Sequence, residues 1–428
     1  MTLSLAQIRT IIFLAGAVIV GYHVVVYKFS TRTKPIKVGI LYSVTGAMRM
    51  SEEPVLRATL LAINEINEKG GVLGRQLEPV IADGRSDAFI FQQQAERLIT
   101  SDHVEVIGGC WLSSCRKAVN AVVEKHGSML IYPAQYEGMY PGPNTLHTGE
   151  TFNQEVLPAT MWALRNLGKR IFIIGNESLF PRVVDALLQQ MVPQLGGEIV
   201  GSEYITIGDE KIEPIVEKIT QVQPDVIINN IAGSSNIILF EKFRKAREIW
   251  KKNIPVMSYN LNDPEIAIIG PENVAGSYTC GSYYDTIKTP ESEKFVQLVH
   301  KAYGKFQTIA QTMQAAYEGM HIWAQGVERA GSTNVTAVKQ AIRNQLYLAP
   351  EGIVAVSDDA LNLYKPFRVA LINPDGSSTI VWDAQMTLPP YAFPSQMFIK
   401  QMITTWSPEK WSDFLHALFV GWNNKWHA

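Results

Sequence analysis

The feature of this 428-residue sequence that most constrains its fold is an alternation of short apolar runs with helix-like segments, which begins at residue 36. Each run stops at glycine, hydroxyl, amide or aromatic residues, and short connections follow. This order is typical of a doubly wound α/β fold with parallel sheets. A first series closes near residue 149 and a second begins at Arg170, so the pattern predicts two Rossmann-like lobes.

The predicted strands cover residues 36–42, 78–83, 171–174, 199–205, 225–228, 254–258, 352–355, 367–372 and 378–382, with two more entering the turns after Ile107 and Leu130. The predicted helices cover residues 56–68, 91–98, 116–125, 182–191, 212–219, 295–304, 312–329 and 334–344, with one more ending at residue 247.

An apolar run of 17 residues, 11–27, precedes the first strand. Its length is near the lower limit for a membrane-spanning helix, and no small-residue cleavage site follows it. We expect an uncleaved membrane anchor, with a cleaved signal peptide as the alternative. The positive-inside rule conflicts with an external domain, because four basic residues follow the run, but large domains translocate largely regardless of nearby charge.

Composition and motifs exclude several classes of function. The formal net charge is -2 and no basic cluster stands out, so the sequence gives no indication of a nucleic-acid-binding surface. The three cysteines, Cys110, Cys115 and Cys280, are expected to be buried thiols, and the first two can pair only if the turn between them brings them close. Catalytic motifs and metal-ligand spacings are missing, and Gly70 to Gly74 reads as a helix stop rather than a phosphate loop. We therefore expect no enzyme activity, cofactor or metal.

Two turns at strand ends are the candidate ligand site. They span residues 107–114 and 130–138, with a predicted helix between them. Neighbouring strands of an open parallel sheet present such turns on one rim, where ligands bind. Trp111, Tyr132 and Tyr136 offer flat surfaces, whereas the hydroxyls of Ser113 and Ser114 can bind a ligand or cap a helix. These neutral groups favour a small, uncharged, hydrogen-bonding ligand.

The order of these motifs resembles the type I periplasmic binding-protein family, in the branch of urea and short-chain amide receptors. That branch includes urea-binding proteins of ABC transporters and the amide-sensing negative regulator of amidase operons. The resemblance covers residues 36–382. It is carried by residues 66–74, 109–119, 132–138, 143–144, 153–154, 180–182 and 349–352, of which Gly-Cys-Trp (109–111) and Tyr-Pro-Ala-Gln-Tyr-Glu-Gly (132–138) are specific to the branch.

The resemblance implies two lobes joined by a hinge. Lobe 1 would hold residues 35–150 and about 284–348, and lobe 2 would hold residues 151–283 and about 349–384. A membrane anchor or signal segment (1–34) would precede them. An aromatic-rich C-terminal extension (385–428) would follow, packed on the body or on a partner, or lying in a membrane interface.

The resemblance also implies which residues contact the ligand. The expected set is Trp111, Ser113, Tyr132, Ala134, Tyr136, Ser178, Phe180, Ser234, Asp263 and Tyr283. Asp263 would accept ligand N–H groups, which an ionised acceptor binds strongly. Family members usually carry a stacking tyrosine where this chain has Ser178. Either another ring, Tyr259 or Tyr283, replaces it, or the ligand is a larger amide.

The function implied is that of an extracytoplasmic solute-binding protein. It would stand on the periplasmic or extracellular face, anchored to the cytoplasmic membrane or secreted after signal cleavage. It would close around urea or a short-chain amide and deliver it to an ABC permease. The first alternative is a membrane-anchored sensor that reports the ligand to a kinase or cyclase. The second is an amide hydrolase, which would release ammonia.

Overall fold

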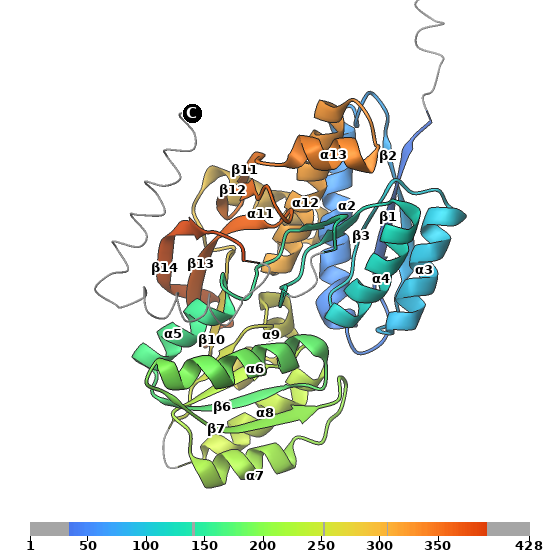
Figure 1. Cartoon of the computed structure of the whole chain (residues 1–428). Coiled ribbons are helices and arrows are strands. Elements are labelled where there is room, and N and C mark those ends of the chain that lie inside the picture. Colours follow the sequence, from blue (N-terminus) through green and yellow to red (C-terminus); the bar gives the residue numbers. More distant parts are fainter. Residues whose placement is uncertain (1–33, 139–141, 251–252, 306, 392–428) are drawn as a thin grey trace, which may run out of the picture.

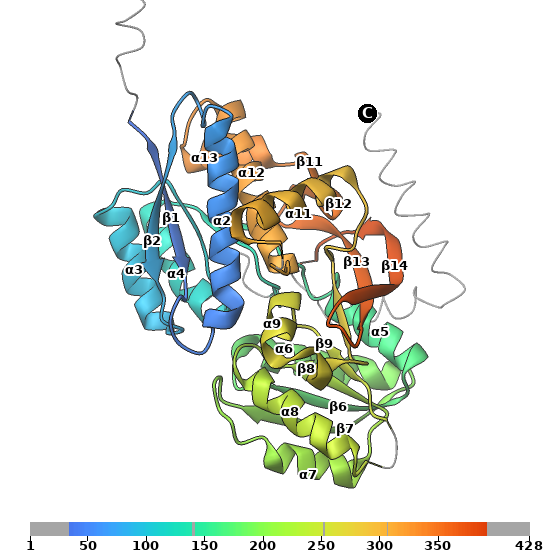
Figure 2. The ribbon, with the colours of Figure 1, turned by 180° about the vertical axis from the view of Figure 1, so that it is seen from behind.

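Two β-sheets flanked by helices organise the computed structural model, which describes residues 34–138, 142–250, 253–305 and 307–391. Figures 1 and 2 show them as two lobes, one above the other, joined by several crossings of the chain. The predicted alternation of strands and helices is confirmed. Among the described residues, no helix is long and apolar enough to cross a membrane. The predicted anchor, residues 11–27, lies outside them.

Lobe 1 is built on a parallel five-stranded sheet with the strand order β2-β1-β3-β4-β5. Its first elements are β1 (Ile36–Tyr42), α2 (Arg49–Glu68), β2 (Leu77–Asp83), α3 (Ala88–Thr100), β3 (Val106–Gly109), α4 (Ser113–His126), β4 (Leu130–Tyr132) and β5 (Thr145–His147). Later helices complete it: α11 (Pro290–Tyr303), α12 (Gln311–Ala330) and α13 (Val335–Ile342). Helices α3 and α4 cover one face, while α2 and α12 cover the other (Figures 1 and 2).

Lobe 2 starts after the chain leaves β5. Its α/β elements are α5 (Val156–Asn166), β6 (Arg170–Asn176), α6 (Leu179–Gln194), β7 (Glu198–Ile205), α7 (Glu213–Val222), β8 (Val226–Asn230), α8 (Ser235–Arg247), β9 (Val256–Ser258), α9 (Asp263–Ile269), α10 (Pro271–Val274) and β10 (Tyr278–Gly281). Antiparallel strands extend the sheet beyond β10: β11 (Leu346–Ala349), β12 (Gly352–Val356), β13 (Leu363–Ile372) and β14 (Ser378–Leu388).

Strand β6 shows why this sequence gives a sheet covered on both faces. Successive side chains of a strand point to opposite faces. Ile171 and Ile173 therefore enter the core under α5 and α6, whereas Phe172 and Ile174 enter the core under α7 and α8. A strand buried on both faces is apolar at every position, as this one is from Ile171 to Ile174.

A buried charge cluster ties the segments that run between the lobes. The ammonium of Lys365 on β13 lies 2.7 Å from a carboxylate oxygen of Glu318 on α12 and 2.9 Å from one of Glu351, which follows β11. It also donates to the carbonyl of Thr148, where the chain leaves β5 for lobe 2 (2.7 Å). All three charged side chains are fully buried, so the cluster fixes where these segments meet.

Two smaller predictions are also settled within the described residues. Cys110, Cys115 and Cys280 are buried free thiols, as expected. Helix α2 ends at Glu68 and a tight turn follows it, so the Gly70 to Gly74 segment is the predicted helix stop. A Cβ on Gly71 would lie 2.0 Å from the carbonyl oxygen of Arg75, which explains the glycine at this positive-φ position.

Candidate ligand-binding site

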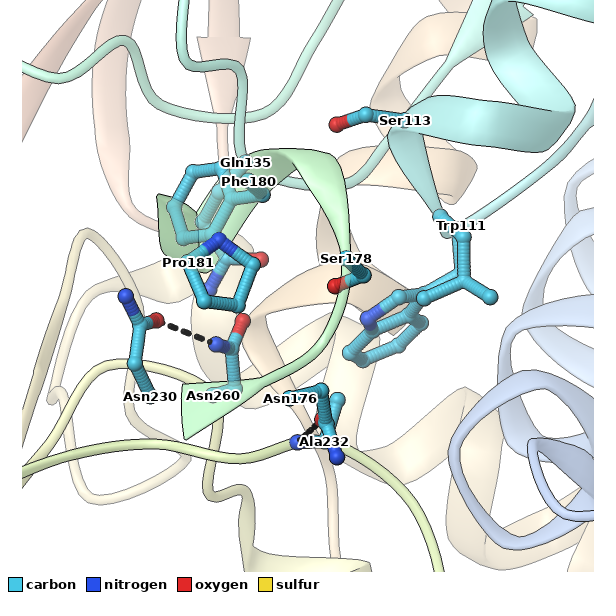
Figure 3. Close-up of a pocket in the computed structure, with 11 residues that line it drawn as sticks. Trp111, Ser113, Gln135, Asn176, Ser178, Phe180, Pro181, Asn230, Ala232 and Asn260 are labelled. Carbon is cyan, nitrogen blue, oxygen red and sulfur yellow. Dashed lines mark hydrogen bonds between the residues drawn. The ribbon is translucent and has the colours of Figure 1, made fainter. Parts of the chain in front are cut away.

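A pocket of about 360 Å³, counting its open mouth, lies between the two lobes (Figure 3). Both lobes contribute to its wall, and the lining side chains are aromatic, aliphatic, amide or hydroxyl groups. The lining residues are Trp111, Leu112, Ser113, Gln135, Asn176, Ser178, Phe180, Pro181, Asn230, Ala232 and Asn260. None of these residues carries an ionisable side chain.

The turn after β3 brings Trp111 into the pocket. A Cβ on Gly109 would lie 2.3 Å from the carbonyl oxygen of Leu41, so only glycine lets β3 approach β1 this closely. Cys110 then adopts a positive φ of 70°, which bends the chain sharply. The indole of Trp111 extends from lobe 1 toward Asn176 and Ser178 of lobe 2 (Figure 3).

Ser113 lines the pocket and also forms hydrogen bonds with other side chains of lobe 1. Leu112 occupies the N-cap of α4 without a side-chain capping bond, so Ser113 is the first helical residue and does not cap the helix. Its hydroxyl donates to a carboxylate oxygen of Glu137 (2.7 Å) and accepts a hydrogen bond from Arg116 (3.2 Å). Ser113 can therefore offer a ligand one oxygen lone pair and no proton.

A buried ion pair holds the two lobe 1 turns together. The guanidinium of Arg116 donates to both carboxylate oxygens of Glu137, at 2.7 and 3.1 Å, and both side chains are almost completely buried (0% and 2% exposed). Arg116 also lies over the rings of Tyr132 and Tyr136, 5.0 and 4.7 Å from their centroids. The two charges neutralise each other behind the pocket wall.

Tyr132, Ala134 and Tyr136 are placed behind the wall. The hydroxyl of Tyr132 donates to the carbonyl of Trp111, and it lies 3.2 Å from the carbonyl of Gln135. Tyr136 stacks on His147, with ring centroids 4.3 Å apart. All three residues are buried, and none of them lines the pocket. Their side chains shape the turns that present Trp111 and Gln135.

Three asparagines supply the polar wall of lobe 2. Asn176, Asn230 and Asn260 stand at or just beyond the ends of β6, β8 and β9. Asn176 accepts the N–H of Ala232 (2.7 Å), and Asn260 donates to the side-chain oxygen of Asn230 (2.8 Å). The Nδ2 groups of Asn176 and Asn230 are buried without a partner among the described residues. Buried donors of this kind indicate an acceptor that a ligand would supply.

Ser178 and Phe180 close the lobe 2 side. Ser178 is the N-cap of α6, in extended conformation and without a side-chain capping bond. Phe180 is in the first turn of that helix and lines the same pocket. Tyr259, one of the rings expected to replace the missing tyrosine, is buried in the lobe 2 core, and its hydroxyl bonds to Thr160 (2.8 Å). Phe180 is the aromatic ring that lobe 2 places in the pocket.

Ser234, Asp263 and Tyr283 lie elsewhere. The backbone N–H of Ser234 donates to the carbonyl of Ala47 across the cleft mouth (3.2 Å). Asp263 and Tyr283 line a second pocket of about 250 Å³ at the N-terminus of α9. Burial, with the nearby charge of Asp285, raises the pKa of Asp263 to about 7, and its carboxylate accepts from Ser378 (3.1 Å).

Of the ten expected contact residues, the structure thus brings four to one pocket: Trp111, Ser113, Ser178 and Phe180. The ten expected residues did not include the four amide side chains, Gln135, Asn176, Asn230 and Asn260, although the resemblance implies that the turn from Asn176 to Phe180 closes over the ligand. The signal was available, because each of them stands at or near the end of a predicted strand, as Trp111 does.

Direct contacts join the lobes across the cleft. Gln135 of lobe 1 donates to the carbonyl of Tyr259 in lobe 2 (2.8 Å). At the mouth, the hydroxyl of Ser51 on α2 donates to the carboxylate of Glu265 on α9. Burial raises the pKa of Glu265 to about 7. These contacts hold the two lobes against each other around the pocket.

Comparison with known proteins points to binding proteins, but not to the predicted urea and amide branch. The sequence profile of the family described as "Periplasmic binding protein domain" matches residues 36–398. A Leu/Ile/Val-binding protein of Rhizobium johnstonii is 22% identical over 318 residues, which cover 72% of this chain and 83% of that protein. A limonene hydroxylase of Geobacillus stearothermophilus is 27% identical over 121 residues, but the match spans only 28% of this chain and 22% of that protein.

Solved structures share the fold. A solute-binding protein of an ABC transporter from R. palustris, in complex with benzoate, has a TM-score of 0.76 at 18% identity and covers 85% of this chain and 99% of its own. A branched-chain amino acid transporter substrate-binding protein from Streptococcus pneumoniae, in complex with isoleucine, has a TM-score of 0.73 at 18% identity, with coverage of 83% and 100%. None of these names mentions urea or an amide.

Proposed function

Because the chain belongs to the periplasmic binding protein domain family, we propose that it is an extracytoplasmic solute-binding protein that closes around a small neutral amide-type ligand and delivers it to an ABC permease. The ligand lies between Trp111 of lobe 1 and the asparagine wall of lobe 2. Contacts with both lobes stabilise the closed state, as in other hinged binding proteins.

One observation carries this proposal: the pocket wall contains four amide side chains and no ionisable one. A charged ligand in a closed cleft loses its hydration, so it needs an opposite charge or several strong hydrogen bonds there. The nearest ion pair, Arg116 with Glu137, is already neutralised behind the wall. A neutral ligand with its own N–H and C=O groups matches this lining without such a cost.

The geometry also favours a planar polar group. The free Nδ2 groups of Asn176 and Asn230 can donate to a ligand carbonyl, and the oxygens of Ser113 and Ser178 can accept ligand N–H groups. Trp111 and Phe180 provide apolar surface for a flat amide or for a short alkyl substituent. Such a mixture of aromatic walls and a few polar groups is typical of small-molecule sites.

A second candidate comes from the relatives, whose names refer to branched-chain amino acids and to benzoate. The two unpartnered asparagine donors can also bind carboxylate oxygens, and the aromatic walls suit a benzoate ring. An amino acid, however, brings an ammonium group, and the pocket wall holds no carboxylate to accept it.

A thermal-shift screen of the full chain separates these candidates. Matched pairs keep the shape and change only the charge: acetamide with acetate, isobutyramide with isobutyrate, and benzamide with benzoate, beside urea and isoleucine. We expect an amide of at least one pair to raise the melting temperature more than its acid. Stabilisation by the acids or by isoleucine alone would replace the amide with the second candidate.

The sensor alternative uses the same pocket and differs only in the partner. Genes beside that of this protein discriminate the two: permease and ATPase genes support delivery, whereas a kinase or cyclase gene supports sensing. Incubation with urea or acetamide tests the hydrolase alternative, since ammonia release would identify an enzyme.

A further inference from the structure

An apolar face lies exposed on the hairpin of β11 and β12, away from the pocket. Leu346, Leu348 and Ile353 are 51%, 55% and 58% exposed. Leu348 pairs directly with Ile353 in the antiparallel ladder, and residues that pair directly point to the same face. Tyr347 and Val354 point to the opposite face and pack on the core. The outward face of this hairpin is therefore apolar but uncovered by the described residues.

The exposed part of this face spans β11 and β12 and ends at Ala355, which pairs with Leu346 but is buried (6% exposed). We call the exposed set the hairpin face: Leu346, Leu348 and Ile353. Ala355 pairs in turn with Tyr364 on β13. Strand β11 is also the free edge of its sheet, and natural proteins usually cover or blunt such an edge because it can pair with another chain.

The C-terminal extension starts near β13, two strands from the free edge of the sheet. After β14, the N–H of Tyr391 donates to Asn153 (2.9 Å), whose amide donates to the carbonyl of Pro389 (2.8 Å). Tyr391 lies near Tyr364, whose hydroxyl adds to the effect of burial in raising the pKa of Tyr391. Leu388 pairs with Lys365, so the described chain ends near the start of β13, the strand that pairs with β12 of the hairpin.

The extension has the length and composition to cover the face. It holds 37 residues (428 minus 391). Neighbouring strands are roughly 5 Å apart, so the way from β13 to β11 is about 10 Å, the span of about three extended residues. Within it, the sequence predicts a helix over residues 407–419. Trp411, Phe414, Leu415 and Leu418 then lie on one side, at the i, i+3, i+4, i+7 spacing of an apolar stripe.

We propose that the aromatic C-terminal extension, residues 392–428, docks on the hairpin face of its own chain and covers the edge of β11. Burying the exposed leucines and isoleucine against tryptophan and phenylalanine rings removes apolar surface from water on both partners. Docking in cis keeps the hairpin from pairing with another copy.

Photo-crosslinking of the full chain in cells tests this. Benzoylphenylalanine replaces Leu348 in one variant and Ile81 in a control, because Ile81 is similarly exposed (48%) but lies on β2 of lobe 1. After irradiation, mass spectrometry identifies the linked peptides at the mass of a single chain. We expect links from position 348 to peptides of residues 392–428, and at most trace links to them from position 81.

A second variant tests the stripe itself. Trp411→Glu with Phe414→Glu in the chain labelled at position 348 should lower the yield of this link at least about fivefold, because two apolar contacts are lost. Links from position 348 only to a second copy, to lipid or to another protein would overturn the proposal, and so would a yield unchanged by the double substitution. Neither position lines the ligand pocket, so this result is independent of ligand binding.

Discussion

At the scale of residues, the candidate site separates groups that face the ligand from groups that hold them. Trp111 faces the pocket, whereas Tyr132, Arg116 and Glu137 fix the turn from behind. The ion pair of Arg116 and Glu137 fixes the turn and adds no net charge to the pocket, because its two members neutralise each other in a buried environment. The ligand therefore meets a neutral wall with a rigid charged support.

Trp111→Ala should weaken binding of the stabilising ligand about 10- to 100-fold, because the largest apolar wall of the pocket is lost. Thermal-shift titration measures this, with Trp162→Ala as the matched control, since Trp162 packs on Tyr278 in lobe 2 outside the pocket. The melting temperature without ligand should stay close to that of the parent protein. Equal losses of affinity in the two variants would exclude this pocket as the site.

Ser178→Tyr should strengthen binding of urea and acetamide, up to about tenfold, because a ring at this position can stack on a planar amide and fills space near Trp111. Larger amides should gain less or lose affinity. Titration calorimetry with acetamide and benzamide measures the ratio, and Ser178→Ala serves as the control that only removes the hydroxyl. Weaker acetamide binding in the tyrosine variant would show that Ser178 makes a needed contact itself.

At the scale of elements, the strands and helices with several turns or alternating residues were predictable. Strand β1 has the predicted bounds, and α12 differs from prediction by one residue at each end. Strands β5, β10 and β11 were missed because each has only three or four residues, too few to show a periodicity. Helix α5 was missed because Pro158 interrupts its pattern. Each asparagine of the lobe 2 wall stands at or near a predicted strand end, but which of these ends face the same pocket depends on strands far apart along the chain.

Lys365→Met should lower the free energy of unfolding by about 3–5 kcal/mol, because Glu318 and Glu351 would be left as buried carboxylates without a cation. Denaturant unfolding measures the change. Adding Glu318→Gln and Glu351→Gln removes those charges, so the triple variant should recover much of the loss. A triple variant as unstable as the single one would mean that packing, rather than charge, makes Lys365 important.

At the scale of the whole molecule, the carboxylate of Glu265 accepts a hydrogen bond from Ser51 of the other lobe and is buried. We expect that opening of the lobes exposes it to water. Burial raises the pKa of Glu265 from its ordinary 4.5 to about 7 in the closed state. Below about pH 4.5 the carboxyl is protonated in both states. As the pH rises from 4.5 to 7, the open state loses its proton first, so closure becomes less favourable, and above 7 the difference is constant.

Ligand affinity should therefore fall as the pH rises from about 4.5 to 7, by roughly 10- to 100-fold, and then level off. Asp263, whose pKa is also raised to about 7 by burial, changes in the same direction if opening exposes it. Calorimetric titrations across this range measure the profile. Glu265→Gln should remove the part of the pH dependence of ligand affinity that this carboxyl contributes. A pH profile unchanged in that variant would contradict this role for the contact between the lobes.

The central claim is that the pocket between the lobes selects a neutral amide over an acid of the same shape. Titration calorimetry of the full chain with isobutyramide and isobutyrate at pH 7 tests it most directly, because the two ligands differ in charge and hardly in size. The pocket wall, with four amide side chains and no ionisable one, predicts that the amide binds at least about tenfold tighter. Tighter binding of the acid, lost in Trp111→Ala, would place a charged ligand in the same pocket and contradict the account.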